Sequence, residues 1–109
     1  MRAWLCAALG CVALAQAPAR AAAVWCAVQD GEVAYVSDIR GPEASSPEAV
    51  HSLASRFVRV VNASKGIHAT LDGSACRRFA DHGAATRGFA IFRNRVEQLG
   101  GRVEFIGAY

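Results

Sequence analysis

The sequence predicts an α+β domain in which two helices pack on one face of a small sheet of three to five strands. Apolar residues recur at three- and four-residue spacing over residues 47–64 and 82–99, which is the pattern of helices with one buried face. Short apolar runs beside turn residues occupy residues 24–38, 67–79 and 102–108, which is typical of strands. The predicted order is ββαβ(β)αβ, which is ferredoxin-like in character. Placing both helices on one face of the sheet is the simplest way to bury the apolar sides of the helices and the strands.

The first stretch, residues 24–38, predicts a β-hairpin with its turn at Asp30-Gly31. An Asp-Gly pair between apolar runs is the strongest short hairpin signal, because both turn positions then need a positive φ. A loop rich in glycine, proline and serine follows over residues 39–46.

The first helix is predicted over residues 47–64. Ser46 can cap its N-terminus and Pro47 suits the first helical position. Lys65 gives a basic last turn, and Gly66 suits the left-handed position that ends a helix.

Residues 66–80 allow two interpretations. A second Asp-Gly pair, Asp72-Gly73, could join strands 67–71 and 75–79 as a second hairpin. The alternative is a loop followed by a single strand around Cys76.

The second helix is predicted over residues 82–99, with Asp81 as its cap and Gly88 allowing close packing on the sheet. Its apolar stripe predicts the buried face; the members are Ala85, Phe89, Phe92, Val96 and Leu99. A last strand is expected over residues 102–108.

Residues 1–23 have the layout of a secretory signal peptide. Arg2 supplies a positive start, residues 3–17 form an uncharged and mostly apolar run, and small residues follow. The run is shorter than the roughly 20 residues that a membrane-spanning helix needs. We therefore expect cleavage after Ala21 or Ala23, which leaves one domain, residues 24–109, without a membrane span.

Charge and composition restrict the partners and suggest the compartment. The whole chain carries a net charge of +3, but Arg2 and Arg20 would leave with the signal peptide, so the domain is nearly neutral. This balance gives no reason to expect nucleic acid or an anionic membrane as a partner. One lysine against eleven arginines, with abundant alanine, is typical of a GC-rich bacterial genome and favours the periplasm or the medium.

Two cysteines remain after signal cleavage, Cys26 and Cys76. Two cysteines in a short exported chain most often pair, so a disulfide is predicted. In the chain-entropy account, a disulfide that closes the loop of about 50 residues between these cysteines stabilises the fold by about 4 kcal/mol.

The sequence contains no recognisable signature of a metal site, a cofactor site or a catalytic site. His68, Asp72, Cys76 and His82 are zinc-ligand types within a short stretch, but their spacing matches no closed zinc pattern and Cys76 is expected in the disulfide. No serine lies in a Gly-x-Ser-x-Gly turn, and the aspartates sit where turns and helix caps favour them. The chain is therefore predicted not to be an enzyme.

The candidate binding surface is aromatic and basic. Trp25 and Tyr35 lie on the two arms of the hairpin, and Tyr109 ends the chain. Six arginines could gather into an anion-binding patch, and Arg77 and Arg78 are the first candidates; the others are Arg87, Arg93, Arg95 and Arg102. The alternative is that the hairpin aromatics fill the core.

The chain resembles small exported bacterial domains without an assigned function. The resemblance is carried by Trp25-Cys26, the run of residues 35–38 (Tyr-Val-Ser-Asp), Cys76 and the Ala/Arg-rich helix. The layout is more loosely similar to the SPOR domain, which implies binding of peptidoglycan glycan. The extra N-terminal hairpin departs from that family, and no site residue is carried over.

These observations predict an exported, non-catalytic binding domain. An envelope protein is the first expected partner, with the domain as its inhibitor, immunity or accessory protein. A cell-wall glycan is the second expected ligand and a small hydrolase is a distant third. A protein binder predicts an exposed apolar or aromatic patch, a glycan binder a shallow aromatic groove, and an enzyme a deep polar pocket.

Overall fold

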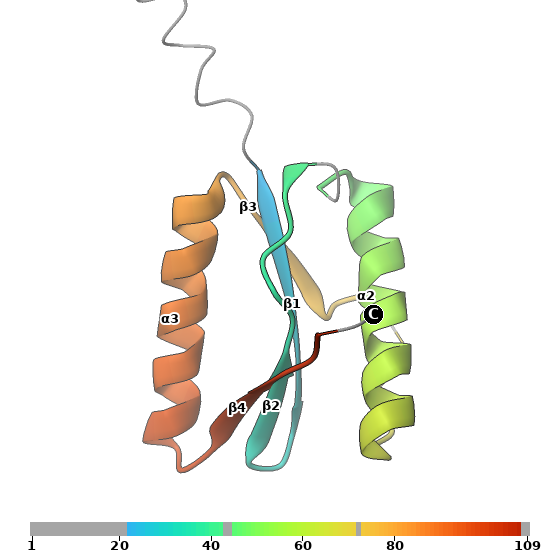
Figure 1. The fold of residues 1–109 in the computed structure, drawn as a ribbon, viewed down its shortest axis with the longest axis vertical. Helices are drawn as coiled ribbons and strands as arrows, with labels where there is room; N and C mark the ends of the chain where they lie inside the picture. Colours follow the sequence, from blue (N-terminus) through green and yellow to red (C-terminus); the bar gives the residue numbers. More distant parts are fainter. Residues whose placement is uncertain (1–21, 43–44, 72, 108–109) are drawn as a thin grey trace, which may run out of the picture.

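The computed structural model describes residues 22–42, 45–71 and 73–107, so residues 1–21 of the expected signal peptide and Tyr109 lie outside the described residues. Two helices and four strands follow each other in the predicted α+β order (Figure 1). The elements are β1 (Ala23–Asp30), β2 (Val33–Val36), α2 (Pro47–Lys65), β3 (Cys76–Phe79), α3 (His82–Gln98) and β4 (Arg102–Phe105).

The strands form one sheet in the order β3-β1-β2-β4. Strand β1 is antiparallel to both of its neighbours: its first half pairs with β3 and its second half with β2. Strand β4 lies parallel to β2. The sheet is therefore mixed, with β3 and β4 as its two edges.

The first hairpin is confirmed, but its turn is shifted by one residue. Asp30 pairs with Val33, so the two central residues are Gly31 and Glu32 rather than Asp30 and Gly31. Gly31 has φ 61°, and no residue other than glycine has a positive φ among those described. Glycine at the first central position alone is the arrangement of a type II′ turn, which also matches the twist of the strands.

The segment before α3 contains one strand, β3, and not a second hairpin. Residues 67–71 are not in a strand, and Asp72 lies outside the described residues. The side-chain amide of Asn62 both donates to the Ala69 carbonyl and accepts from the Ala69 N–H, at 3.1 and 2.9 Å. These bonds hold the loop against α2 and replace the partner strand that a hairpin would need.

Both predicted helices are confirmed together with their caps. The Ser46 hydroxyl accepts the N–H of Ala49, and Gly66 ends α2 in the left-handed region at φ 68°. The Asp81 carboxylate accepts the N–H of Ala84 at 2.7 Å and begins α3.

The expectation that both helices pack on one face, as in a ferredoxin-like fold, is wrong. Figure 1 shows α2 and α3 on opposite sides of the sheet. Alternate residues of β1 separate accordingly: Val24 and Cys26 lie in the core beneath α2, whereas Ala23 and Trp25 lie in the core beneath α3. Six apolar residues in succession begin β1, which suits a strand that is covered on both faces.

The strand order gives a physical reason for the two faces. The connection through α2 runs from β2 to the edge strand β3, and the connection through α3 runs back from β3 to the other edge, β4. Both connections join parallel strands, and such crossovers are right-handed in nearly all proteins. Two right-handed crossovers that run in opposite directions place their helices on opposite faces.

The core beneath α2 is the larger of the two. Five residues of α2 are buried: Leu53, Ala54, Phe57, Val58 and Val61. Only Ala85 and Val96 of α3 are buried to that degree. Among the described residues, no helix is long and apolar enough to cross a membrane.

Candidate binding groove beside helix α3

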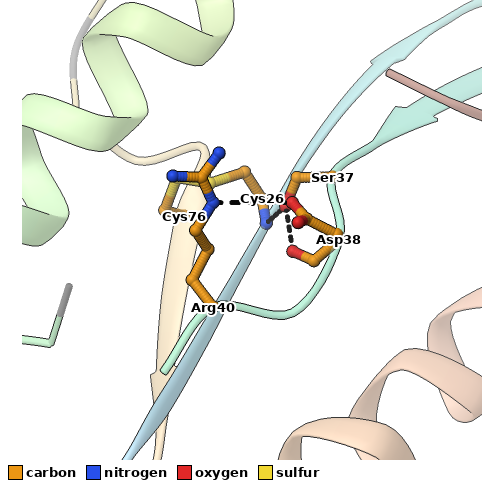
Figure 2. Close-up of polar contacts among 5 residues, drawn as sticks. All are labelled: Cys26, Ser37, Asp38, Arg40 and Cys76. Atoms are coloured by element: carbon orange, nitrogen blue, oxygen red, sulfur yellow. Dashed lines mark hydrogen bonds and ion pairs between the residues drawn. A yellow bond between two sulfur atoms is a disulfide. The ribbon is translucent and has the colours of Figure 1, made fainter. Parts of the chain in front are cut away.

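The predicted disulfide is confirmed and fixes the edge strand. Cys26 of β1 and Cys76 of β3 are directly opposite each other and are joined through their sulfur atoms, with their Cα atoms 3.9 Å apart (Figure 2). The pairing continues one residue beyond this register, where the Ala27 N–H donates to the Ala75 carbonyl at 2.8 Å. The short strand β3 is thus held covalently at one end.

Ser37 is the single buried polar side chain among the described residues, and it completes the pairing of β1. Its hydroxyl accepts the Cys26 N–H and donates to the Asp38 carbonyl, each at 2.8 Å, as Figure 2 shows. Its own N–H donates to the Cys26 carbonyl. Because the buried hydroxyl has partners both as a donor and as an acceptor, its hydrogen bonds explain its presence in the core, and it gives no reason to infer a catalytic role.

Trp25 lies in the core and not on an open surface. It is 1% exposed, its indole N–H donates to the Ala85 carbonyl at 3.0 Å, and its ring stacks on Phe79 at 5.6 Å. Of the two interpretations of the hairpin aromatics, the structure therefore places this residue in the core. The reason is that α3 covers the face of β1 that the sequence alone left open.

Tyr35 is also nearly buried, on the α2 face. The Lys65 Nζ atom lies 5.8 Å from the centre of its ring and 2.5 Å from Glu104 Oε2. The hydrogen bond between these two charges raises the pKa of Lys65 and lowers the pKa of Glu104. This pair closes the end of the α2 core rather than forming a site.

The structure does not bring the two candidate arginines together. Arg77 and Arg78 are successive residues of one strand, so their side chains point to opposite faces of the sheet. Arg78 lines a hollow of about 700 Å³ at the N-terminus of α2, together with Ser46 and His51. Arg77 lies on the α3 face, with its guanidinium 5.9 Å from the Trp25 ring.

A groove of about 410 Å³ runs along α3 beside the edge strand β3. On the helix side it is lined at helical spacing by Gly88, Ile91, Phe92, Arg95, Val96 and Leu99. On the sheet side it is lined by Trp25, Gln29, Arg77 and Phe79. The groove therefore has an apolar floor between two guanidinium groups.

Two large apolar side chains of this groove are exposed. Ile91 is 59% exposed and Leu99 is 77% exposed. Leu99 was predicted to belong to the buried stripe of the helix, and this is wrong: α3 ends at Gln98, and the Leu99 side chain, at the C-cap position, is exposed. Exposed apolar groups beside a groove are typical of interaction surfaces.

The groove arginines have no acidic partner within the described part of the chain. No carboxylate lines the groove, and neither Arg77 nor Arg95 forms an ion pair there. Both side chains are exposed. The groove therefore presents two uncompensated positive charges beside apolar side chains.

The described residues contain no group of three or more histidine, cysteine, aspartate or glutamate side chains that could hold a metal. The sulfur of Cys76 is in the disulfide, and Asp72 lies outside the described residues. A thiolate ligand at Cys76 would need the disulfide to be reduced.

Sequence reasoning did not identify Ile91 or Gln29 as surface residues of one site, and it named Arg95 only as one of six arginines of a possible anion-binding patch. Ile91 and Arg95 lie one turn apart on α3, beside the predicted buried stripe, and this second row is a signal that the sequence contains. The position of Gln29 and Arg77 depends on which strand lies at the edge, and the sequence did not decide the strand order.

Comparison of this chain with protein-family models, with curated proteins and with solved structures finds no match. The resemblance to the SPOR domain therefore has no support beyond the layout of the sequence.

Proposed function

We propose that this chain is an exported, non-catalytic domain that binds a protein partner in the cell envelope through the groove beside α3. The observation that carries the proposal is that the exposed apolar side chains of Ile91 and Leu99 lie in one groove with the guanidinium groups of Arg77 and Arg95. Apolar anchors with arginine at the rim are favoured at protein interfaces, where arginine is enriched and forms directional hydrogen bonds. An inhibitor, immunity or accessory role fits such a surface.

Export is supported by the disulfide and by the layout of residues 1–23. Disulfides persist mainly in oxidising compartments such as the periplasm. Ala23 is 1% exposed and pairs with Phe79 in the sheet, which favours signal cleavage after Ala21 over cleavage after Ala23. N-terminal sequencing of the exported protein distinguishes the two sites, and a mature chain that starts at Val24 would contradict this choice.

Glycan binding through the hairpin aromatics has less support. Sugar rings stack on open aromatic faces, whereas Trp25 is enclosed and Tyr35 is nearly so. Sedimentation of the protein with isolated cell wall tests this alternative.

The test is capture of the tagged protein from the cell envelope after mild crosslinking, with sedimentation on isolated cell wall in parallel. Three forms are compared: the native chain, Ile91→Asp in the groove, and Ser52→Asp on the exposed side of α2. We expect one dominant protein that is captured by the native chain and the Ser52→Asp variant and is lost with Ile91→Asp. Equal capture by all three, or sedimentation with the wall and no protein partner, would contradict the proposal.

A further inference from the structure

We infer that the occupant of the groove is an extended segment of the partner, rich in apolar and acidic residues, which adds a strand to the outer edge of β3. This inference rests on the proposed protein-binding function and specifies how the groove is filled. It is carried by three features: the backbone of β3, the apolar row of α3 and the two groove arginines.

The first feature is an open row of backbone groups. Strand β3 is at one end of the sheet order, and β1 is its only strand partner within the described chain. The Ala27 N–H bonds to the Ala75 carbonyl, so alternate residues from Ala75 direct their N–H and C=O groups toward β1. The N–H and C=O groups of Cys76 and Arg78 therefore point away from β1, to the outer edge, where an extended peptide can pair with them.

The second feature is the position of the groove relative to that edge. Arg77 and Phe79 of β3 face α3 and line the groove together with Ile91 of the helix. A strand added beside β3 would direct every second side chain to this same face. Those side chains would lie against the exposed apolar row of α3, which β3 alone is too short to cover.

The third feature is charge. Arg77 projects from the edge strand and Arg95 from the helix, and neither has an acidic partner within the described residues. A carboxylate on the added strand would gain paired hydrogen bonds with a guanidinium, which neutral or basic residues would not. The pattern that fits is an alternation of apolar and acidic residues on the side facing the groove.

The test uses a capped ten-residue peptide in which valine and aspartate alternate at the groove-facing positions and threonine fills the others. The control peptide carries lysine in place of aspartate. We expect the aspartate peptide to bind by fluorescence anisotropy and the Arg77→Glu/Arg95→Glu variant to lose about tenfold or more in affinity for it. The same variant should prefer the lysine peptide, which a folding defect would not produce.

Backbone pairing is tested by N-methylation. One alternate set of peptide N–H groups faces β3 and the other faces away, so methylation of one set should abolish binding and methylation of the other should leave it. Binding should also slow hydrogen exchange at the Cys76 and Arg78 amides. Equal binding of both methylated peptides, or unchanged exchange at these amides, would overturn strand addition.

The failures of the two proposals are distinguishable. If envelope capture requires Ile91 but the aspartate peptide does not bind, the inference falls and the proposed function stands. If the chain forms a dimer that Ile91→Asp abolishes, a second copy is the occupant and the inference falls. If the Ile91→Asp variant captures the same protein as the native chain, the proposed function itself is contradicted.

Discussion

The two faces of the sheet are covered by helices of similar length but to very different degrees. Helix α2 buries five side chains, and Lys65 and Glu104 close the end of its core. Helix α3 buries two, and it leaves Ile91 and Leu99 exposed beside the edge strand. The α2 face therefore contributes more buried apolar surface to the fold, and the α3 face is the one that we propose as the binding surface.

The largest expected effect comes from the disulfide, which joins β1 to the edge strand β3. The cysteine side chains lie in the α2 core, but the strand that they fix, β3, forms one wall of the groove. We expect the Cys26→Ala/Cys76→Ala variant to lose about 4 kcal/mol of unfolding free energy in urea, because the bridge closes a 50-residue separation. The native, non-reduced protein should show no reactive thiol at these two positions, and two alkylated cysteines there would contradict the account.

A matched pair of leucines compares the faces directly. Leu53 is 2% exposed on α2, whereas Leu99 is 77% exposed beyond the end of α3. Leu53→Ala should destabilise the domain by about 2 to 5 kcal/mol because it opens a cavity, and Leu99→Ala should change stability by less than about 0.5 kcal/mol. Similar losses in urea unfolding would show that the α3 face is packed as closely as the α2 face.

Two glycines of α3 give a smaller contrast. A Cβ atom at Gly88 would lie 2.7 Å from Phe79 Cε2, and the Phe79 ring stacks on Trp25. Gly83 has more room, since its nearest neighbour is the end of the flexible Arg87 side chain at 3.3 Å. Gly83→Ala should stabilise the domain by up to about 1 kcal/mol, while Gly88→Ala should give no gain or a loss. A gain at both positions in thermal unfolding would mean that α3 is not in close contact with β3.

The smallest effect is the pH dependence from Lys65 and Glu104. The pKa of Glu104 is lowered in the folded state, so its contribution to stability is present above its ordinary pKa and is lost as the pH falls through the folded value. The pKa of Lys65 is raised, so its contribution is present below its ordinary pKa and is lost as the pH rises through the folded value. Glu104→Gln should reduce the dependence of the unfolding free energy on pH in both ranges, and an unchanged pH profile would show that this partly exposed pair contributes nothing measurable.

The local structure was predictable because it depends on neighbouring residues. Ser46 and Asp81 cap the helices by bonding to N–H groups three residues away, and Gly66 ends α2 at a position that only glycine adopts easily. The helix faces followed from the same local periodicity. The pairing of Cys26 with Cys76 followed from the count of two cysteines outside the predicted signal peptide.

The arrangement of the sheet was not predictable, because it depends on contacts between distant segments. The continuous apolar run of β1 was compatible with one covered face or two until the crossovers were known. The groove depends on Arg77 of β3 lying beside Ile91 of α3, and that proximity requires β3 to be the edge strand. The sequence contained the arginines and the apolar row but not their relation in space.

The most direct test of the central claim places a photo-crosslinking amino acid, p-benzoylphenylalanine, on each face in turn. Ile91 is replaced in the groove and Ser52 is replaced on the exposed side of α2, and intact cells that produce each full-length variant are irradiated. The account predicts a discrete protein adduct from position 91 and none from position 52. Adducts from position 52 alone would contradict it, because the partner would then bind the face that we assign to stability.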